Sequence, residues 1–159
     1  ANTLWFLGLP DEARAARDAA LAWAAEVGHR YSRSVAVTFA ALLALDMGDE
    51  EELRKQVAEL TVIGSEPVSE HVVAAFTGYL TVLDGDPDVG LVPIRAAVEH
   101  TRGGGDAPGH HAVMLRLLLT ACQAAGDDAA AAAVAERMLA MGGTARLWAP
   151  TARRVLARA

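Results

Sequence analysis

The chain has 159 residues, of which 53% are hydrophobic but only 5% aromatic, so alanine and leucine supply most of the apolar surface. Its formal net charge is −6 and no basic stripe stands out, which argues against direct binding of nucleic acid. No apolar run reaches the roughly 18 residues that a membrane span needs, and no signal peptide is evident, so we expect a cytoplasmic protein without a membrane segment.

Four glycine-centred turns organise the chain. They lie at Gly8, Gly48, Gly85 and Gly126, and a near-constant repeat of about 40 residues between them is typical of helical-hairpin arrays. Alanine and leucine favour helix, and no stretch alternates between apolar and polar residues as a strand would. The sequence therefore predicts an all-α superhelix of antiparallel hairpins, about four in number, with one terminal helix.

The first residues are expected to be the end of a helix. Residues 1–8 resemble a last helical turn, so we interpret residues 1–159 as a single domain excised from a longer protein. The next helix is predicted over residues 10–27, with Pro10 at its first position, where the missing amide costs nothing. Its packing face is predicted to be Ala13, Ala16, Ala20, Leu21 and Ala24, with Arg14, Arg17 and Asp18 facing water.

The second hairpin is predicted from helices over residues 32–47 and 50–62. The first would pack through Val35, Phe39, Leu42, Leu43 and Met47, and the second through Leu53, Val57 and Leu60. Asp49 has the side chain of an N-cap, and Glu52 is expected to complete a capping box. The segment from Gly64 to Pro67 is predicted to end this hairpin.

The third hairpin is predicted to begin near Ser69, and its second helix to begin with Asp86 as the cap and Pro87 at the first position. Gly78 lies inside the first helix at a cost of about 1 kcal/mol, unless close packing uses it. Pro93 is expected to kink or loosen the second helix, at about 3 kcal/mol. The packing residues would be Val72, Val73, Phe76, Tyr79, Leu80 and Leu83.

A glycine-rich loop over residues 103–109 is predicted to follow, and then the fourth hairpin. Its helices are expected over residues 110–125 and from Gly126 to about Met141. Residues 148–158 are predicted to form a short final helix. A terminal element of this kind covers the open apolar end of the last repeat.

The repeats resemble the tetratricopeptide pattern, which places small or apolar residues at fixed distances from the turn glycine. The positions five residues after the turn glycine are Ala13, Leu53, Gly90 and Ala131, and those twelve residues after it are Ala20, Leu60, Ala97 and Met138. Seven residues before the glycine, Ala41 and Gly78 match the small residue of the pattern, whereas Leu119 departs from it. Together with residues 4–13, 24–29 and 146–154, they look most like the tetratricopeptide-like region of large bacterial ATP-dependent transcriptional regulators. Those regulators carry a LuxR-type or winged-helix output, or are linked to an adenylate cyclase. The resemblance implies a flanking ATPase or DNA-binding domain in the full-length protein.

The sequence contains few candidate catalytic groups. The chain has no GxxxxGK[ST] loop, and adjacent His110 and His111, near Asp106, point about 100° apart on a helix, so they rarely bind one ion. Cys122 lies in an apolar run and is interpreted as a small buried hydrophobe rather than a nucleophile. We therefore expect no catalytic residue, no metal and no cofactor.

The candidate binding surface is the concave face of the array, formed by the first helix of each hairpin. The residues placed there are Trp5, Phe6, Thr38, Leu42, Leu45, Asp46, Tyr79, Val82, Arg116, Thr120 and Gln123, of which Trp5, Thr38, Tyr79, Arg116 and Gln123 are the candidate ligand contacts. Arg116 is expected to clamp a carboxylate or phosphate. Alternatively, Leu42, Leu45 and Val82 belong to the core.

The function predicted from these features is non-enzymatic. The chain would bind a protein, a peptide or a small effector within a bacterial signalling or transcriptional regulator. The alternative is a homo-oligomerisation scaffold, such as a homodimer formed through the apolar groove or an exposed end. A small all-α enzyme is the third reading, and it needs a cluster of titratable residues that the spacing does not supply.

Overall fold

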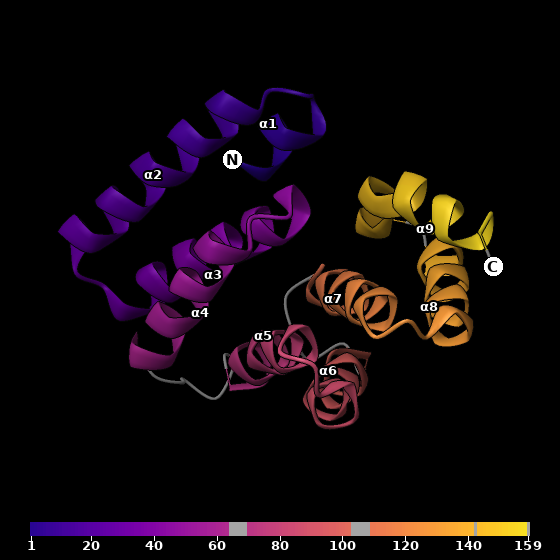
Figure 1. The fold of residues 1–159 in the computed structure, drawn as a ribbon. Helices are drawn as coiled ribbons and strands as arrows, with labels where there is room; N and C mark the ends of the chain where they lie inside the picture. Colours follow the sequence, from indigo (N-terminus) through magenta and orange to yellow (C-terminus); the bar gives the residue numbers. More distant parts are fainter. Residues whose placement is uncertain (64–69, 103–108, 142, 159) are drawn as a thin grey trace. The chain divides into compact units, whose positions relative to one another are not determined.

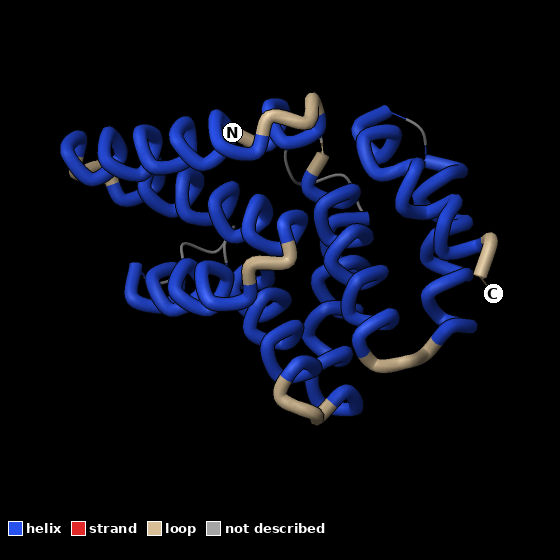
Figure 2. The backbone as a smooth tube through the Cα atoms, turned by 45° about the horizontal axis from the view of Figure 1, so that its top comes forward, coloured by secondary structure: helices blue, strands red, loops and turns tan. Residues whose placement is uncertain are grey.

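The computed structural model describes residues 1–63, 70–102, 109–141 and 143–158, and these form helices joined by turns, with no strand (Figure 2). Figure 1 labels the α-helices in chain order. The helices are α1 (Asn2–Phe6), α2 (Pro10–Val27), α3 (Arg30–Met47), α4 (Glu50–Ile63), α5 (Glu70–Leu83), α6 (Pro87–Arg102), α7 (His110–Ala124), α8 (Asp128–Met141), the 3-10 helix η1 (Gly143–Trp148) and α9 (Ala149–Leu156). The all-α prediction is confirmed.

The chain forms two compact units, Ala1–Val73 and Ala74–Ala159. Within the first unit α1 packs on α2, α2 on α3, and α3 on α4. Within the second, α6 packs on α7, α7 on α8, and α8 on both η1 and α9. Within each unit, the helices named here thus contact their neighbours in sequence, which is the packing rule of helical repeats.

The four predicted glycine turns share one pattern of hydrogen bonds. At Gly48, the glycine N–H donates to Leu45 O at 3.2 Å, and the Asp49 N–H donates to Ala44 O at 2.9 Å. These two bonds define a Schellman motif, which satisfies carbonyls that a helix end leaves free. The same pair of bonds closes the turns at Gly8, Gly85 and Gly126. All four glycines have φ between 70° and 98°, where a β-carbon is disfavoured.

Three of these turns also cap the helix that follows. The first Oδ of Asp49, Asp86 and Asp127 accepts from an amide three residues on, at 3.1, 3.4 and 2.9 Å respectively. One Gly-Asp pair therefore ends one helix and begins the next, which is why the turn is so short. In the first turn Leu9 takes the place of the aspartate, and no side chain caps α2.

The capping box predicted from Glu52 is wrong. The Asp49 amide that Glu52 would bind already donates to Ala44 O. The Glu52 Oε1 atom instead accepts from Gln56 Nε2 at 2.7 Å and lies 3.8 Å from Arg17 Nη1. Arg17 was predicted to face water, but its side chain is only 12% exposed, because it lies beside Glu52.

Most predicted helix limits agree with the structure to within two residues. At the C-terminal end, η1 precedes α9, whereas a single helix from Trp148 was predicted. Trp148, Ala152 and Val155 are buried, and α9 packs on α8, so the predicted covering of the last hairpin is confirmed. Several predicted features lie outside the described residues, namely the stop at residues 64–67, the start at Ser69, the glycine-rich loop at 103–108, and Gly142.

The repeat positions named in the sequence are packing positions. All of them are buried except Ala20. α3 differs from its predicted face, because Val35 and Phe39 are 37% and 50% exposed, while Val37 and Ala41 are buried. α3 carries apolar residues on several sides, so periodicity alone does not select the side that packs.

α5 and α6 approach each other closely at Gly78 and Gly90. A β-carbon on Gly78 would lie 2.5 Å from Gly90 O and 2.7 Å from Pro93 Cγ. Gly78 therefore serves close packing, which offsets the propensity cost predicted from the sequence. The disruption predicted at Pro93 does not end the helix, since α6 continues to Arg102.

Candidate functional site

The five residues predicted to contact a ligand are divided between the two units. Trp5 and Thr38 belong to the first unit, and Tyr79, Arg116 and Gln123 to the second. Trp5 and Thr38 are partly buried, Tyr79 is buried, and Gln123 is exposed. The alternative reading of Leu42, Leu45 and Val82 as core residues is confirmed, because their exposed fractions are 3%, 6% and 5%.

Arg116 lies in a more enclosed position than a ligand clamp needs. The residue is only 8% exposed. Its Nη1 atom donates to the hydroxyl of Thr120, one turn further along α7, and that hydroxyl donates to Arg116 O at 3.0 Å. The guanidinium is therefore held along its own helix, and a ligand reaching it would have to displace packed side chains.

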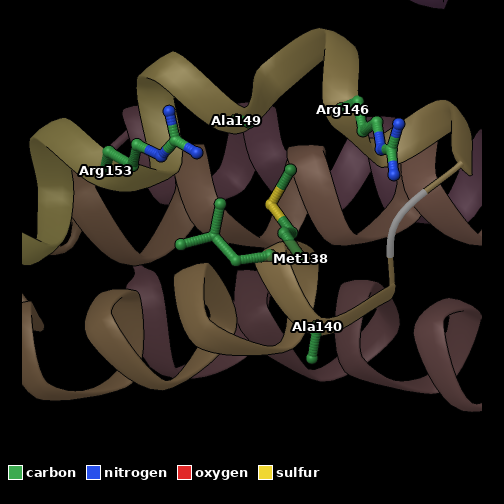
Figure 3. Close-up of a pocket in the computed structure, with 6 residues that line it drawn as sticks. Met138, Ala140, Arg146, Ala149 and Arg153 are labelled. Atoms are coloured by element: carbon green, nitrogen blue, oxygen red, sulfur yellow. The ribbon is translucent and has the colours of Figure 1, made fainter.

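A more accessible cleft opens in the second unit, between the C-terminal end of α8 and the segment formed by η1 and α9 (Figure 3). Its volume is about 580 Å³, within the range of roughly 300–1,000 Å³ that small-ligand sites occupy. The lining residues are Met138, Leu139 and Ala140 from α8, Arg146 from η1, and Ala149 and Arg153 from α9.

The sequence of α9 explains how this cleft is built. Trp148, Ala152 and Val155 are spaced to lie on one helical face, and all three are buried. Successive residues on a helix point about 100° apart, so Arg153 lies at the edge of that face rather than beneath it. Arg153 is exposed, and Figure 3 shows its guanidinium on one side of Ala149, with Arg146 on the other.

The cleft lies in a strongly basic part of an acidic chain. From Arg137 to the last residue the sequence contains five arginines and no aspartate or glutamate, so all 20 acidic residues precede this segment. Arg137 forms an ion pair with Glu99 at 3.5 Å, and Arg154 donates to the Thr151 hydroxyl at 3.2 Å.

The two arginines of the cleft differ from these. Neither Arg146 nor Arg153 makes a side-chain hydrogen bond or ion pair with another residue in the described part of the chain. Their donors are accordingly available to an acceptor outside the described residues. Arg146 and Arg153 were not among the predicted contacts, because the whole-chain charge of −6 conceals a local excess of arginine. A charge count restricted to the residues after Glu136 would have found them.

The floor of the cleft is apolar. Met138 is only 1% exposed, Leu139 and Ala149 are partly buried, and all three line the cleft. Positive charge at the edges and apolar groups between them suit a ligand that combines acidic and apolar groups. The described residues of this unit offer no nucleophile or general base in the same cleft.

Two other hollows lack such a charge pattern. One of about 300 Å³ lies between α2 and α3, beside Trp23 and Tyr31, whose exposed fractions are 62% and 58%. Another of about 630 Å³ lies along α5 and α6, over Gly78 and Pro93. Both are lined mainly by apolar side chains, so their linings do not indicate which partner would bind there.

Two titratable groups singled out in the sequence, Cys122 and His111, have pKa values that their surroundings shift. Burial, and then the charge of Asp127, raise the pKa of the Cys122 thiol above its ordinary value, so the thiolate is disfavoured. Burial and then the charge of Arg137 lower the pKa of His111, whose Nδ1 lies 3.0 Å from Thr101 Oγ1. No group of three or more metal-ligating side chains occurs among the described residues, and Asp106 lies outside them.

Comparison with known proteins identifies no relative, since no family model, no curated protein and no solved structure matches the chain. None of the described helices has both the length and the hydropathy required to cross a bilayer.

Proposed function

We propose that the chain is a non-enzymatic binding module of tetratricopeptide-like hairpins that recognises an acidic partner or effector in the cleft between α8 and η1–α9. The observation that carries this proposal is the pair of exposed arginines, Arg146 and Arg153, above an apolar floor. The resemblance of the repeats supports the wider setting, a bacterial signalling or transcriptional regulator in the cytoplasm. In that setting, occupancy of the cleft is passed to a neighbouring ATPase or DNA-binding domain.

The chemistry of arginine supports an acidic ligand. A guanidinium presents a planar fork of N–H donors that matches a carboxylate or a phosphate. Each exposed ion pair contributes only about 0.2–1 kcal/mol, whereas covering about 100 Å² of apolar surface, counted over both partners, contributes about 2.5 kcal/mol. The apolar part of the ligand therefore supplies most of the affinity, and the acidic groups supply selectivity.

These magnitudes predict weak binding. A total of about 4 kcal/mol corresponds to a Kd of about 1 mM, so the isolated interaction is expected in the millimolar to high micromolar range. Binding of this strength suits a segment presented by a larger partner, for which a second contact raises the effective concentration.

The proposal is tested by NMR titration of the ¹⁵N-labelled chain with capped hexapeptides that contain two glutamates and a leucine. The matched peptides have glutamine in place of each glutamate. The expected result is a shift of the amide signals of residues 138–153 that is several times larger with the acidic peptides than with the neutral ones. Equal shifts with the neutral peptides, or no shift in this segment at about 5 mM, several times the expected Kd, would refute the proposal.

A homo-oligomerisation scaffold is the second candidate, and one observation favours it. In the first unit Trp23, Tyr31 and Phe39 are all at least half exposed, and exposed aromatic residues of this size are typical of protein contacts. Light scattering over a hundredfold concentration range decides the matter. A mass that rises with concentration in the wild type, but not in Phe39→Ser, would support this candidate, and a constant monomer mass would remove it.

A further inference from the structure

The two arginines of the cleft are placed at its two ends. In Figure 3, Arg146 and Arg153 lie on opposite sides of Ala149, and Met138 lies between them on the α8 side. Both side chains are exposed, and both belong to the basic C-terminal segment. The cleft therefore offers two separate positive groups with an apolar stretch between them, rather than one concentrated anion site.

Helix geometry sets the distance between the two groups. Three residues of a 3-10 helix separate Arg146 from Ala149, which corresponds to about 6 Å at about 2 Å per residue. Four residues of α-helix separate Ala149 from Arg153, which corresponds to about 6 Å at about 1.5 Å per residue. The backbone positions of the two arginines are thus at most about 12 Å apart, taking both rises along one line.

This length matches a particular peptide pattern. In an extended chain, side chains at positions 1, 3 and 5 point to the same side, and positions 1 and 5 lie about 13 Å apart. In an α-helix, about eight residues are needed to span about 12 Å at about 1.5 Å per residue, and the helix is about 10–12 Å in diameter. The extended chain spans the same distance with about five residues and a smaller width, so it is the better fit to this cleft.

We infer that the cleft binds an extended peptide segment of a partner protein, with acidic side chains at positions 1 and 5 and an apolar side chain at position 3. This inference rests on the proposed function and makes it specific. Arg146 binds one carboxylate and Arg153 the other. The central apolar side chain lies against Leu139 and Ala149, above Met138, whose unbranched and flexible side chain adapts to different shapes.

A spacing series tests the inference. Three capped peptides carry a central leucine, threonine at the neutral positions, and two glutamates that are two, four or six residues apart. Each is titrated into the ¹⁵N-labelled chain, and both backbone amides and arginine Nε–H signals are followed. The four-residue spacing is expected to bind about threefold to tenfold more tightly than the other two, the factor that one or two exposed ion pairs supply. It should also shift the Nε–H signals of both Arg146 and Arg153.

The outcomes separate this inference from the proposal beneath it. If all three spacings bind equally, the acidic ligand stands and the two-point pattern is refuted. The pattern is also refuted if the best peptide shifts the signal of only one arginine. If no acidic peptide shifts residues 138–153, the proposed function fails as well.

Charge-matched variants complete the test. Arg146→Gln and Arg153→Gln should each weaken the four-spaced peptide about twofold to fivefold. A peptide that keeps only the glutamate facing the remaining arginine should be nearly unaffected by the same variant. Arg158→Gln removes the same charge outside the lining residues, and it should change affinity less than twofold. Tighter binding of duplex DNA, or of suberate as a free dicarboxylate, with the same arginine dependence would overturn the assignment to a peptide.

Discussion

Replacing Gly78 by alanine should destabilise the protein, although helix propensity alone predicts the opposite. Alanine is favoured over glycine inside a helix by about 1 kcal/mol. However, the added methyl group would lie 2.5 Å from Gly90 O, 2.7 Å from Pro93 Cγ and 3.3 Å from Ile94 Cγ1. The first of these atoms belongs to the backbone of α6, so the contact is relieved only if the two helices separate.

The size of the effect follows from these two opposing contributions. Overpacking of a close contact costs about 1–3 kcal/mol, and the propensity gain offsets about 1 kcal/mol of it. Because the closest atom belongs to the backbone of α6, the cost is expected in the upper part of that range, about 2–3 kcal/mol, so the expected net loss is about 1–2 kcal/mol. For a chain of this length, this lowers Tm by about 2–8 °C, taking about 2–4 °C for each kcal/mol.

Urea unfolding followed by circular dichroism at 222 nm measures this difference. Ala74→Gly, at an exposed position of the same helix, is the matched control, and it should lose about 1 kcal/mol from propensity alone. A Gly78→Ala variant that is as stable as the wild type or more stable would show that propensity dominates. The close crossing of α5 and α6 would then be wrong.

Four further predictions concern single side chains. Asp49→Ala removes a helix cap and should lower stability by about 1 kcal/mol. Leu9→Asp should raise stability by up to about that amount, because α2 lacks a side-chain cap. The midpoints of urea unfolding measure both changes. Arg116→Ala should lower the unfolding midpoint, because the residue is 8% exposed and packed, whereas an exposed arginine would leave the midpoint unchanged. Burial lowers the folded-state pKa of His111 below 6.5. The unfolded chain therefore binds more protons, and the free energy of unfolding falls as the pH drops through about 6.5. The His111→Gln variant should show a smaller fall between about pH 7.5 and 5.5 than the wild type, and an equal fall would contradict this.

The turns were predictable because their causes are local. A glycine followed by an aspartate combines a residue that tolerates positive φ with a side chain that caps a helix. Both functions act within six residues at Gly48 and Asp49, so neither depends on the rest of the fold. Only the capping box failed, because a backbone carbonyl, Ala44 O, had already taken the amide that Glu52 was expected to bind.

The faces of the helices were less predictable because they depend on distant contacts. Arg17 is drawn against α4 by Glu52, 35 positions further along the chain, and nothing near Arg17 in the sequence indicates that contact. Phe39 was expected to pack because it is apolar, but α3 has more apolar positions than its neighbours cover. The sequence around α3 permits several packing faces, and tertiary contacts select among them.

The candidate cleft shows the same distinction. The excess of arginine after Glu136 is visible in the sequence. That Arg146 and Arg153 lie on either side of an apolar floor depends on η1, a 3-10 helix that the periodicity did not indicate. Charge patterning alone would therefore have indicated a basic segment, but not a cleft with two separated positive groups.

The claim that an acidic ligand binds between α8 and η1–α9 is tested most directly by isothermal titration calorimetry with the peptide Glu-Thr-Leu-Thr-Glu. Two double variants remove the same charge, R146Q/R153Q within the cleft and R154Q/R158Q outside its lining. The first should weaken binding about fivefold to thirtyfold, the upper part of the range that two exposed ion pairs of up to about 1 kcal/mol each supply, and the second less than about twofold. An equal loss in both would show that binding responds only to net charge, and it would contradict a site in the cleft.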